Sequence, residues 1–87
     1  MNKPKNTMKV SFPSRGANEG LARMLVAAFI TEADPTVEEL CDIKTAVSEA
    51  VTNCIVHAYP DRIGEIYIAA SLSESNLVTI KVRDHGC

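Results

Sequence analysis

Hydrophobic and polar residues alternate in three short stretches of the chain, and this alternation predicts three β-strands. The first covers residues 8–13 and is stopped by Pro13. The second, residues 65–72, carries apolar side chains on both parities, which predicts a central strand covered on at least one face. The third, residues 77–84, alternates strictly, and the polar residues 73–76 before it predict a hairpin turn.

A helical period replaces this alternation after the first strand. From Asn18 the apolar residues recur at spacings of three and four, and Pro35 disfavours helix at Asp34. We expect the inward face of this helix to be formed by Leu21, Leu25, Ala28 and Phe29, with Ala22 and Met24 beside it. The helix should therefore end shortly before Pro35.

A second and longer helix begins just after this proline. Thr36, followed three residues later by Glu39, matches the capping box that marks a helix start. Apolar residues then recur at helical spacing up to about Ala58. The expected inward stripe comprises Val47, Ala50, Val51, Cys54 and Ala58.

The order strand, helix, helix, strand, strand predicts an α/β fold, a two-layer sandwich with the helices on one face of the sheet. Residues 1–7 are polar and are expected to form a flexible tail, and residues 8–87 one small domain. Cys41 and Cys54 lie among aliphatic residues and are expected to be buried thiols.

Composition narrows the classes of function. The net charge is −2, which gives no electrostatic reason to expect a nucleic-acid partner. No apolar run approaches the roughly 18 residues that a membrane span needs. The first residues also lack the apolar core of a signal peptide, so a cytoplasmic protein is the default expectation.

The long helix carries a row of polar side chains within "EAVTNCIVHAY". Glu49, Asn53 and His57 stand four residues apart and therefore share one side of the helix. Their row approaches the apolar stripe, where an amide and an imidazole need hydrogen-bonding partners. The solvated edge of an ordinary amphipathic helix would give the same pattern.

The third strand carries a second polar intrusion. Val78, Ile80 and Val82 share the core parity, and Asp84 follows on the same parity. Gly86 comes two residues later, where the backbone could approach a ligand closely. A strand-end turn in which Asp84 bonds its own backbone is the alternative.

The two intrusions together indicate a nucleotide site at the boundary of the two layers. A carboxylate can accept the amine proton of adenine, an asparagine oxygen suits Mg²⁺, and a neighbouring glutamate can deprotonate a hydroxyl. The sequence has no Walker-type Gly-Lys loop that would hold phosphates in another way.

The same residues carry a resemblance to a known superfamily. "SEAVTNCIVHAY" resembles the N box, and "VRDHG" the start of the next box, of the GHKL ATP-binding (Bergerat) fold. Within that superfamily the chain is similar to the anti-sigma F factors of endospore-forming bacteria, in order and spacing from Met8 to the end. The resemblance implies a mixed, mainly antiparallel sheet.

The resemblance also implies an activity and partners. Members of this family bind a sporulation sigma factor when loaded with ATP and keep it from RNA polymerase. They are also serine kinases that phosphorylate an anti-anti-sigma factor, and they form homodimers. Arg23, in "EGLARML", matches a family arginine that meets both protein partners, although an ordinary exposed helix arginine would look the same.

By position, the resemblance gives each polar residue a role. Glu49 would be the general base for the serine of the partner, and Asn53 the ligand of Mg²⁺. His57 would line the same cleft near the phosphates or the ribose. Asp84 would read the adenine amine, with Gly86 giving close approach to the ring.

The chain departs from the family pattern at its end. The expected D-x-G-x-G box stops at "DHGC", and the ATP lid and the later glycine motifs do not follow, so we expect a fold incomplete at its C-terminus. We therefore expect residues 1–87 by themselves to bind ATP poorly. Ala58 stands where some relatives have glycine. Two alternatives remain, a catalytically inactive sigma-binding module and a histidine-kinase catalytic domain.

Overall fold

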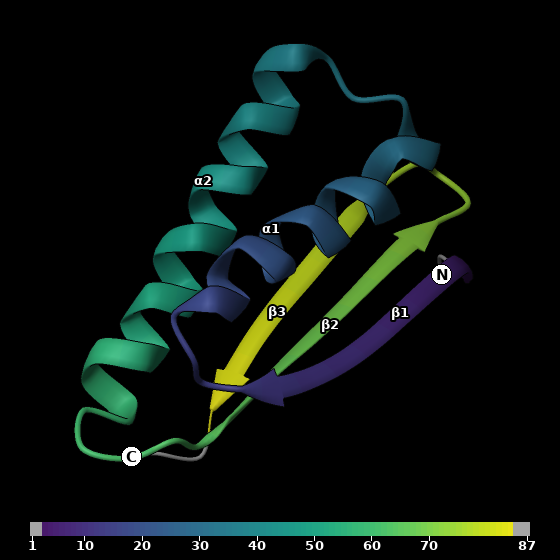
Figure 1. Ribbon diagram of the computed structural model, residues 1–87. Helices are drawn as coiled ribbons and strands as arrows, with labels where there is room; N and C mark the ends of the chain where they lie inside the picture. Colours follow the sequence, from purple (N-terminus) through teal and green to yellow (C-terminus); the bar gives the residue numbers. More distant parts are fainter. Residues whose placement is uncertain (1–2, 85–87) are drawn as a thin grey trace.

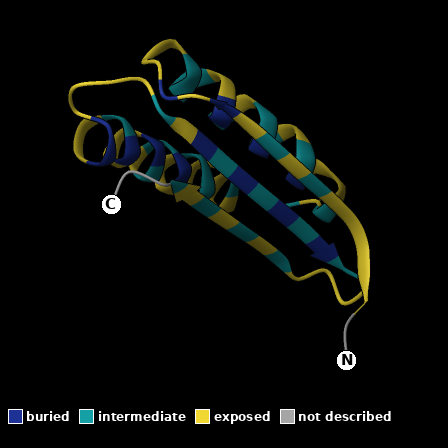
Figure 2. Cartoon of the chain, turned by 90° about the horizontal axis from the view of Figure 1, so that it is seen from below, coloured by how far each residue is buried: buried dark blue, intermediate teal, exposed yellow. Residues whose placement is uncertain are grey.

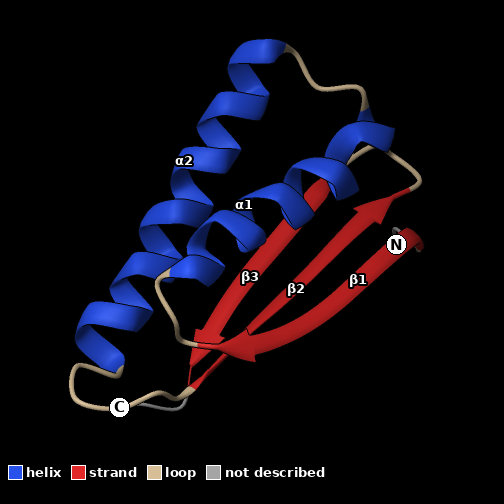
Figure 3. Ribbon diagram, in the orientation of Figure 1, coloured by secondary structure: helices blue, strands red, loops and turns tan. Residues whose placement is uncertain are grey.

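The computed structural model describes residues 3–84, which form two layers with the helices on one face of an antiparallel sheet (Figures 1 and 3). The sheet has the strand order β1-β2-β3, and both pairs are antiparallel. This architecture confirms the predicted α/β class. The elements in chain order are β1 (Pro4–Pro13), α1 (Ala17–Ile30), α2 (Val37–Asn53), β2 (Glu65–Ser73) and β3 (Val78–Asp84).

Strand β2 is the central strand, as its apolar residues on both parities predict. Its buried and half-buried residues alternate along the strand (Figure 2). The buried row consists of Ile66, Ile68, Ala70 and Leu72. In register, Ile68 lies between Val10 of β1 and Val82 of β3, so the inward rows of all three strands form one apolar layer.

Strand β1 begins earlier than the sequence pattern suggests. It starts at Pro4 rather than at Met8, and Thr7 pairs with Ser71 of β2. Residues 4–7 therefore belong to the sheet, and the predicted tail over residues 1–7 is wrong for that part. The pattern missed them because their side chains are all exposed, so no apolar alternation marks the strand.

The inward face of α1 differs from the predicted one. Ala22, Val26 and Ile30 are buried, whereas the exposed fractions of Leu21 and Met24 are 43% and 71%. Ala28 is exposed as well. Apolar residues surround most of this helix, and α1 packs against α2 as well as the sheet, so tertiary packing rather than periodicity selects the face.

Helix α2 confirms the predicted capping box. The backbone N–H of Glu39 donates to Thr36 Oγ1 at 3.0 Å, and the Thr36 N–H donates to Glu39 Oε1 at 2.8 Å. The hydrogen bonds to Thr36, the backbone one first, hold the pKa of the Glu39 carboxyl below its usual range. Cys41, one turn further on, is exposed, so its predicted burial is wrong, while Cys54 is buried as expected.

The helix continues to Ala58 as predicted, but its last five residues, Cys54–Ala58, form a π-helical turn. The Tyr59 N–H donates to the Cys54 carbonyl at 3.1 Å across this turn. Val47, Val51, Cys54 and Ala58 are buried, which confirms those four members of the predicted stripe, whereas Ala50 is only half-buried. Such π-turns within helices frequently lie at functional sites.

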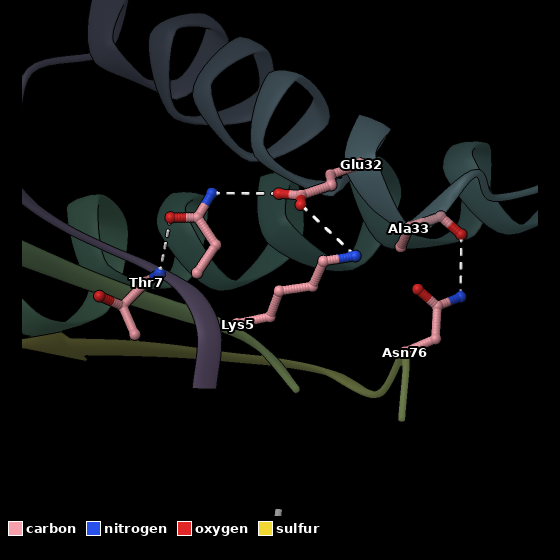
Figure 4. A network of polar contacts seen from close by, with 6 residues as sticks. Lys5, Thr7, Glu32, Ala33 and Asn76 are labelled. Carbon is pink, nitrogen blue, oxygen red and sulfur yellow. Dashed lines mark hydrogen bonds and ion pairs between the residues drawn. The ribbon is translucent and has the colours of Figure 1, made fainter. Parts of the chain in front are cut away.

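Polar contacts join the helices to the sheet near the C-terminal end of α1 (Figure 4), at the opposite end of the molecule from the π-helical turn (Figure 1). Glu32, in the 3-10 turn after α1, forms an ion pair with Lys5 Nζ at 3.6 Å and accepts a hydrogen bond from Asn6 Nδ2 at 3.3 Å. Asn76 Nδ2 donates to the Ala33 carbonyl at 3.0 Å. Asn76 has a φ of 67°, typical of the predicted hairpin turn.

At the other end, the loop after α2 is fixed by Tyr59. Its hydroxyl donates to the Glu65 carbonyl at 2.9 Å, and its ring lies directly against Gly64. A Cβ at Gly64 would stand 2.1 Å from a carbon of that ring, so only glycine fits there. The loop in turn holds the buried Ser14, whose hydroxyl accepts from the Gly64 N–H at 2.9 Å. These contacts join the loop after α2 to the start of β2 and to the residue that follows β1.

Candidate functional site

Helix α2 and the π-turn carry the predicted polar row on one side. Glu49 and Asn53 lie in α2, and His57 lies in the π-turn. All three side chains are exposed, while Val51 and Cys54 on the other side of the helix are buried. Exposure of the row is compatible both with the solvated edge of an amphipathic helix and with an open binding site. The residues around the row distinguish the two interpretations.

Two of the three residues share a hollow with α1. A shallow hollow of about 380 Å³ between the two helices contains both Glu49 and Asn53. Its lining residues are Glu19, Arg23, Ser48, Glu49, Thr52 and Asn53. The structure thus brings the predicted base, the predicted magnesium ligand and the predicted partner-binding Arg23 to one place. His57 is not among the residues of this hollow.

A polar network joins the two helices at the edge of the hollow. Glu19 Oε2 accepts from Arg23 Nη1 at 3.1 Å and from the Ser48 hydroxyl at 2.5 Å. Arg23 Nη1 also lies 3.4 Å from Ser48 Oγ. Because Glu19 and Arg23 belong to α1 and Ser48 to α2, the network fixes the two helices relative to each other next to Glu49.

Asp84 lies at the end of β3 on the core parity, as the sequence predicts. It is half-buried and stands opposite Ile66 in the register with β2. The Cys54 thiol donates to Asp84 Oδ2 at 3.4 Å, so the end of β3 meets the start of the π-turn. Asn53, the residue before Cys54, therefore belongs to the helical turn that Asp84 approaches.

The remaining predicted site residue, Gly86, lies outside the residues that the structure describes. Its predicted role near the adenine ring stays a prediction. The roles of Glu49, Asn53, His57 and Asp84 are likewise predictions at this point, although the positions of these four residues are now known.

Away from the contact between Cys54 and Asp84, the boundary between α2 and β3 is apolar. A groove of about 390 Å³ runs between the two elements and is separate from the polar hollow. Its lining residues are Ile43, Ala46, Val47, Ala50, Val78, Ile80 and Val82. Among residues 3–84, polar groups therefore gather at one end of this boundary, where Cys54 contacts Asp84, and we call this the polar end.

The side-chain oxygens of Glu49 and Asn53 in the hollow fit a hydrated magnesium ion better than a soft metal. No group of three or more His, Cys, Asp and Glu side chains within residues 3–84 could hold a metal on its own. Mg²⁺ is usually held by one or two protein oxygens, several waters and substrate phosphates. The exposed Asn53, beside Glu49 in the open hollow, suits that mode of binding.

Comparison with known proteins places the chain in a family. Residues 12–87 match the family model described as the histidine kinase-like ATPase domain. The match covers most of the chain, and the chain belongs to this family. The two-layer α/β fold with helices on an antiparallel sheet agrees with that assignment.

More specific similarity is to proteins named Anti-sigma F factor. The chain is 56% identical over 81 residues to the one from Thermoanaerobacter sp. (strain X514), 51% over 81 residues to that of Clostridium kluyveri, and 48% over 83 residues to that of Priestia megaterium. The alignments cover 93%, 93% and 94% of this chain. The chain spans 56% of the length of each of these relatives.

Three residues that line the hollow, Glu19, Ser48 and Thr52, were not predicted from the sequence. The spacing of four between Glu19 and Arg23 is a usable signal, because oppositely charged residues at that distance pair on a helix. No sequence signal links Glu19 to Ser48, which is 29 residues away.

None of the described helices is long and apolar enough to cross a membrane.

Proposed function

We propose that this chain carries the ATP-binding and catalytic residues of an anti-sigma factor that is also a serine kinase. The observation that carries the proposal is the shared hollow, in which Glu49, Asn53 and Arg23 line one space between α1 and α2. Membership of the histidine kinase-like ATPase family supports ATP as the nucleotide, and the similarity to proteins named Anti-sigma F factor supports a sigma factor as a partner.

In the proposed reaction, Glu49 acts as the general base. Its exposed carboxylate accepts the proton of a serine hydroxyl on an anti-anti-sigma factor. The serine oxygen bonds to the γ-phosphorus of ATP, and the bond between that phosphorus and the β–γ bridging oxygen breaks, which releases ADP. The hollow is open to solvent, so a segment of a partner protein has room to reach Glu49.

Asn53 holds Mg²⁺ in this proposal through its side-chain oxygen. When bound, the ion neutralises charge on the phosphate oxygens during transfer. Asn53 lies one helical turn after Glu49, so the two side chains are neighbours on the same face of α2. This spacing puts the metal ligand next to the base without any further loop.

Asp84 reads the adenine amine in this proposal, and its Oδ2 accepts a hydrogen bond from the Cys54 thiol at 3.4 Å. His57 lies one turn beyond Asn53 and would contact the phosphates or the ribose. Gly86, just after β3, would let the backbone approach the ring.

Arg23 contacts both protein partners in the proposal, the sporulation sigma factor and the anti-anti-sigma factor. Its side chain is 43% exposed and borders the hollow of Glu49, so a partner bound at Arg23 would also face the base. We further propose that the protein acts in the cytoplasm as a homodimer.

One assay separates this function from its alternatives. The protein is incubated with Mg²⁺, [γ-³²P]ATP and a candidate anti-anti-sigma factor, and the label is tested for acid stability. The proposed kinase gives acid-stable label on the partner. Tight sigma-factor binding without any transfer would instead indicate an inactive sigma-binding module. Acid-labile label, typical of phosphohistidine, would indicate a histidine-kinase catalytic domain.

A further inference from the structure

Glu19 has no role in the proposed reaction, yet it is at the centre of the network beside the hollow. A single oxygen, Oε2, accepts from both Arg23 Nη1 and the Ser48 hydroxyl. The third side of this triangle is the contact of 3.4 Å between Arg23 Nη1 and Ser48 Oγ. The side chain of Glu19 is only 27% exposed, so the arrangement is partly shielded from water.

The network connects the partner-binding residue to the catalytic helix. Ser48 directly precedes Glu49 in α2, and all of these side chains line the hollow of about 380 Å³. Glu19 of α1 and Ser48 of α2 both contact Nη1 of Arg23. These contacts hold the guanidinium in one position relative to the Glu49 carboxylate. Without Glu19, the long side chain of Arg23 would have to lose its rotamer freedom each time a partner binds.

The network also leaves Arg23 able to bind a partner. Both described contacts of its guanidinium use Nη1, and a guanidinium has five N–H donors. Ion pairs with partly exposed members add little to folding stability. The geometry of the network is therefore better explained by the orientation of Arg23 than by stability.

We propose that Glu19 is a positioning residue for protein-partner recognition. It holds Arg23 in the orientation that receives an acidic group of the acceptor protein, and through Ser48 it keeps that docking point in register with Glu49. This inference rests on the proposed kinase function, because it concerns how the acceptor protein reaches the same hollow. Glu19 controls the binding of the acceptor and takes no part in phosphate transfer itself.

The main test is steady-state kinetics of Glu19→Gln with the anti-anti-sigma factor as the varied substrate. The variant keeps the size of the side chain but removes its charge. We expect the KM for the acceptor protein to rise about fivefold to tenfold, with kcat and the KM for ATP changed by less than about twofold. An unchanged KM for the acceptor, or a loss confined to kcat, would overturn the proposal.

Ser48 provides the matched pair of variants. Ser48→Ala removes the hydroxyl and should raise the same KM by a smaller factor, whereas Ser48→Thr keeps a hydroxyl and should restore it. Glu74→Gln, in the exposed β2–β3 turn, is the charge-matched control and should leave all constants unchanged. A lower melting temperature of Glu19→Gln without any change in the acceptor KM would show a purely structural role and refute the proposal.

A second measurement does not depend on the kinase activity. ¹⁵N NMR of the arginine side chains should show slow rotation of the Arg23 guanidinium in the wild-type protein and faster rotation in Glu19→Gln. If the wild type transfers no phosphate, the proposed function fails while this spectrum still tests the positioning by Glu19. Equal rotation rates in the two proteins would contradict it.

Discussion

The boundary between α2 and β3 joins two regions of opposite character. At one end, Val47 of α2 faces Val78 and Ile80 of β3 across an apolar groove. At the other end, Cys54 contacts Asp84, and the exposed Asn53 is adjacent to this contact. Both ends lie on the same parity of β3, while the helix is α-helical beside the groove and π-helical from Cys54 onward. The contrast shows that the polar residues at one end are a local feature that core packing does not require.

Glu49→Gln should have the largest effect at the polar end. Removal of a general base lowers the rate of the transfer step by about 10²- to 10⁴-fold, while ATP binding should change little, because the base acts mainly in the transition state. Rates of phosphate transfer and ATP titrations of the variant measure both quantities. Glu38→Gln, in the exposed first turn of the same helix, is the control. Transfer by Glu49→Gln at the wild-type rate would remove Glu49 from the base role.

Ile68→Ala should cause the largest loss of folding stability in the apolar core beside the groove. Ile68 is fully buried and pairs with Val82, so the substitution leaves a cavity that costs about 2–5 kcal/mol of unfolding free energy. Urea denaturation followed by circular dichroism measures the loss. Tyr67→Phe, on the other face of β2, should stay within about 0.5 kcal/mol of the wild type. Equal losses for the two variants would contradict the described core.

The sequence predicts much of this contrast, because periodicity is sufficient wherever one face is clearly apolar. The strict alternation of β3 places Asp84 correctly, and the spacing of four places Glu49 and Asn53 on one side of α2. Periodicity does not predict the buried face of α1, since Leu21 and Met24 are apolar but exposed. There, packing against two neighbours decides which side is buried.

Other features lie beyond any sequence pattern. The contact between Glu19 and Ser48 depends on how two helices pack, and no spacing in the chain encodes it. The π-turn that begins at Cys54 follows from the local hydrogen bonds of the folded helix. The start of β1 at Pro4 depends on pairing with β2, because its first residues have no buried side to mark them.

Asp84→Asn should separate binding from stability at the polar end. We expect nucleotide affinity to fall about 10- to 100-fold, because a hydrogen bond to a charged group contributes about 1.5–3 kcal/mol, with a much smaller change in unfolding free energy. Cys54→Ala should weaken nucleotide binding less, and Cys54→Ser, which keeps a donor for Asp84, should restore it. Isothermal titration with Mg-ATP and thermal melting measure the two quantities. A large loss of stability with unchanged affinity in Asp84→Asn would make Asp84 a structural residue.

Thr36→Ala, at the start of α2 and away from both ends of the comparison, should have the smallest effect. Loss of the cap costs about 1 kcal/mol of unfolding free energy. The lowered pKa of Glu39 adds a pH dependence: its contribution is present above the ordinary pKa of a glutamate and is lost as the pH falls through the lowered value. Denaturation between pH 3 and pH 7 should therefore show a smaller acid-induced loss in Glu39→Gln, whose side chain does not titrate, than in the wild type. Identical pH profiles of Glu39→Gln and the wild type would contradict the lowered pKa of Glu39.

The most direct test of the central claim is an NMR titration of ¹⁵N-labelled protein with Mg-ATP, which detects weak as well as tight binding. We predict that amide shifts concentrate at the polar end, in residues 49–57 and 82–84, and that residues 43–47 and 78–80 beside the apolar groove change little. Shifts that concentrate at the apolar groove, or no shifts at millimolar ATP, would contradict the assignment of the polar end as the nucleotide site.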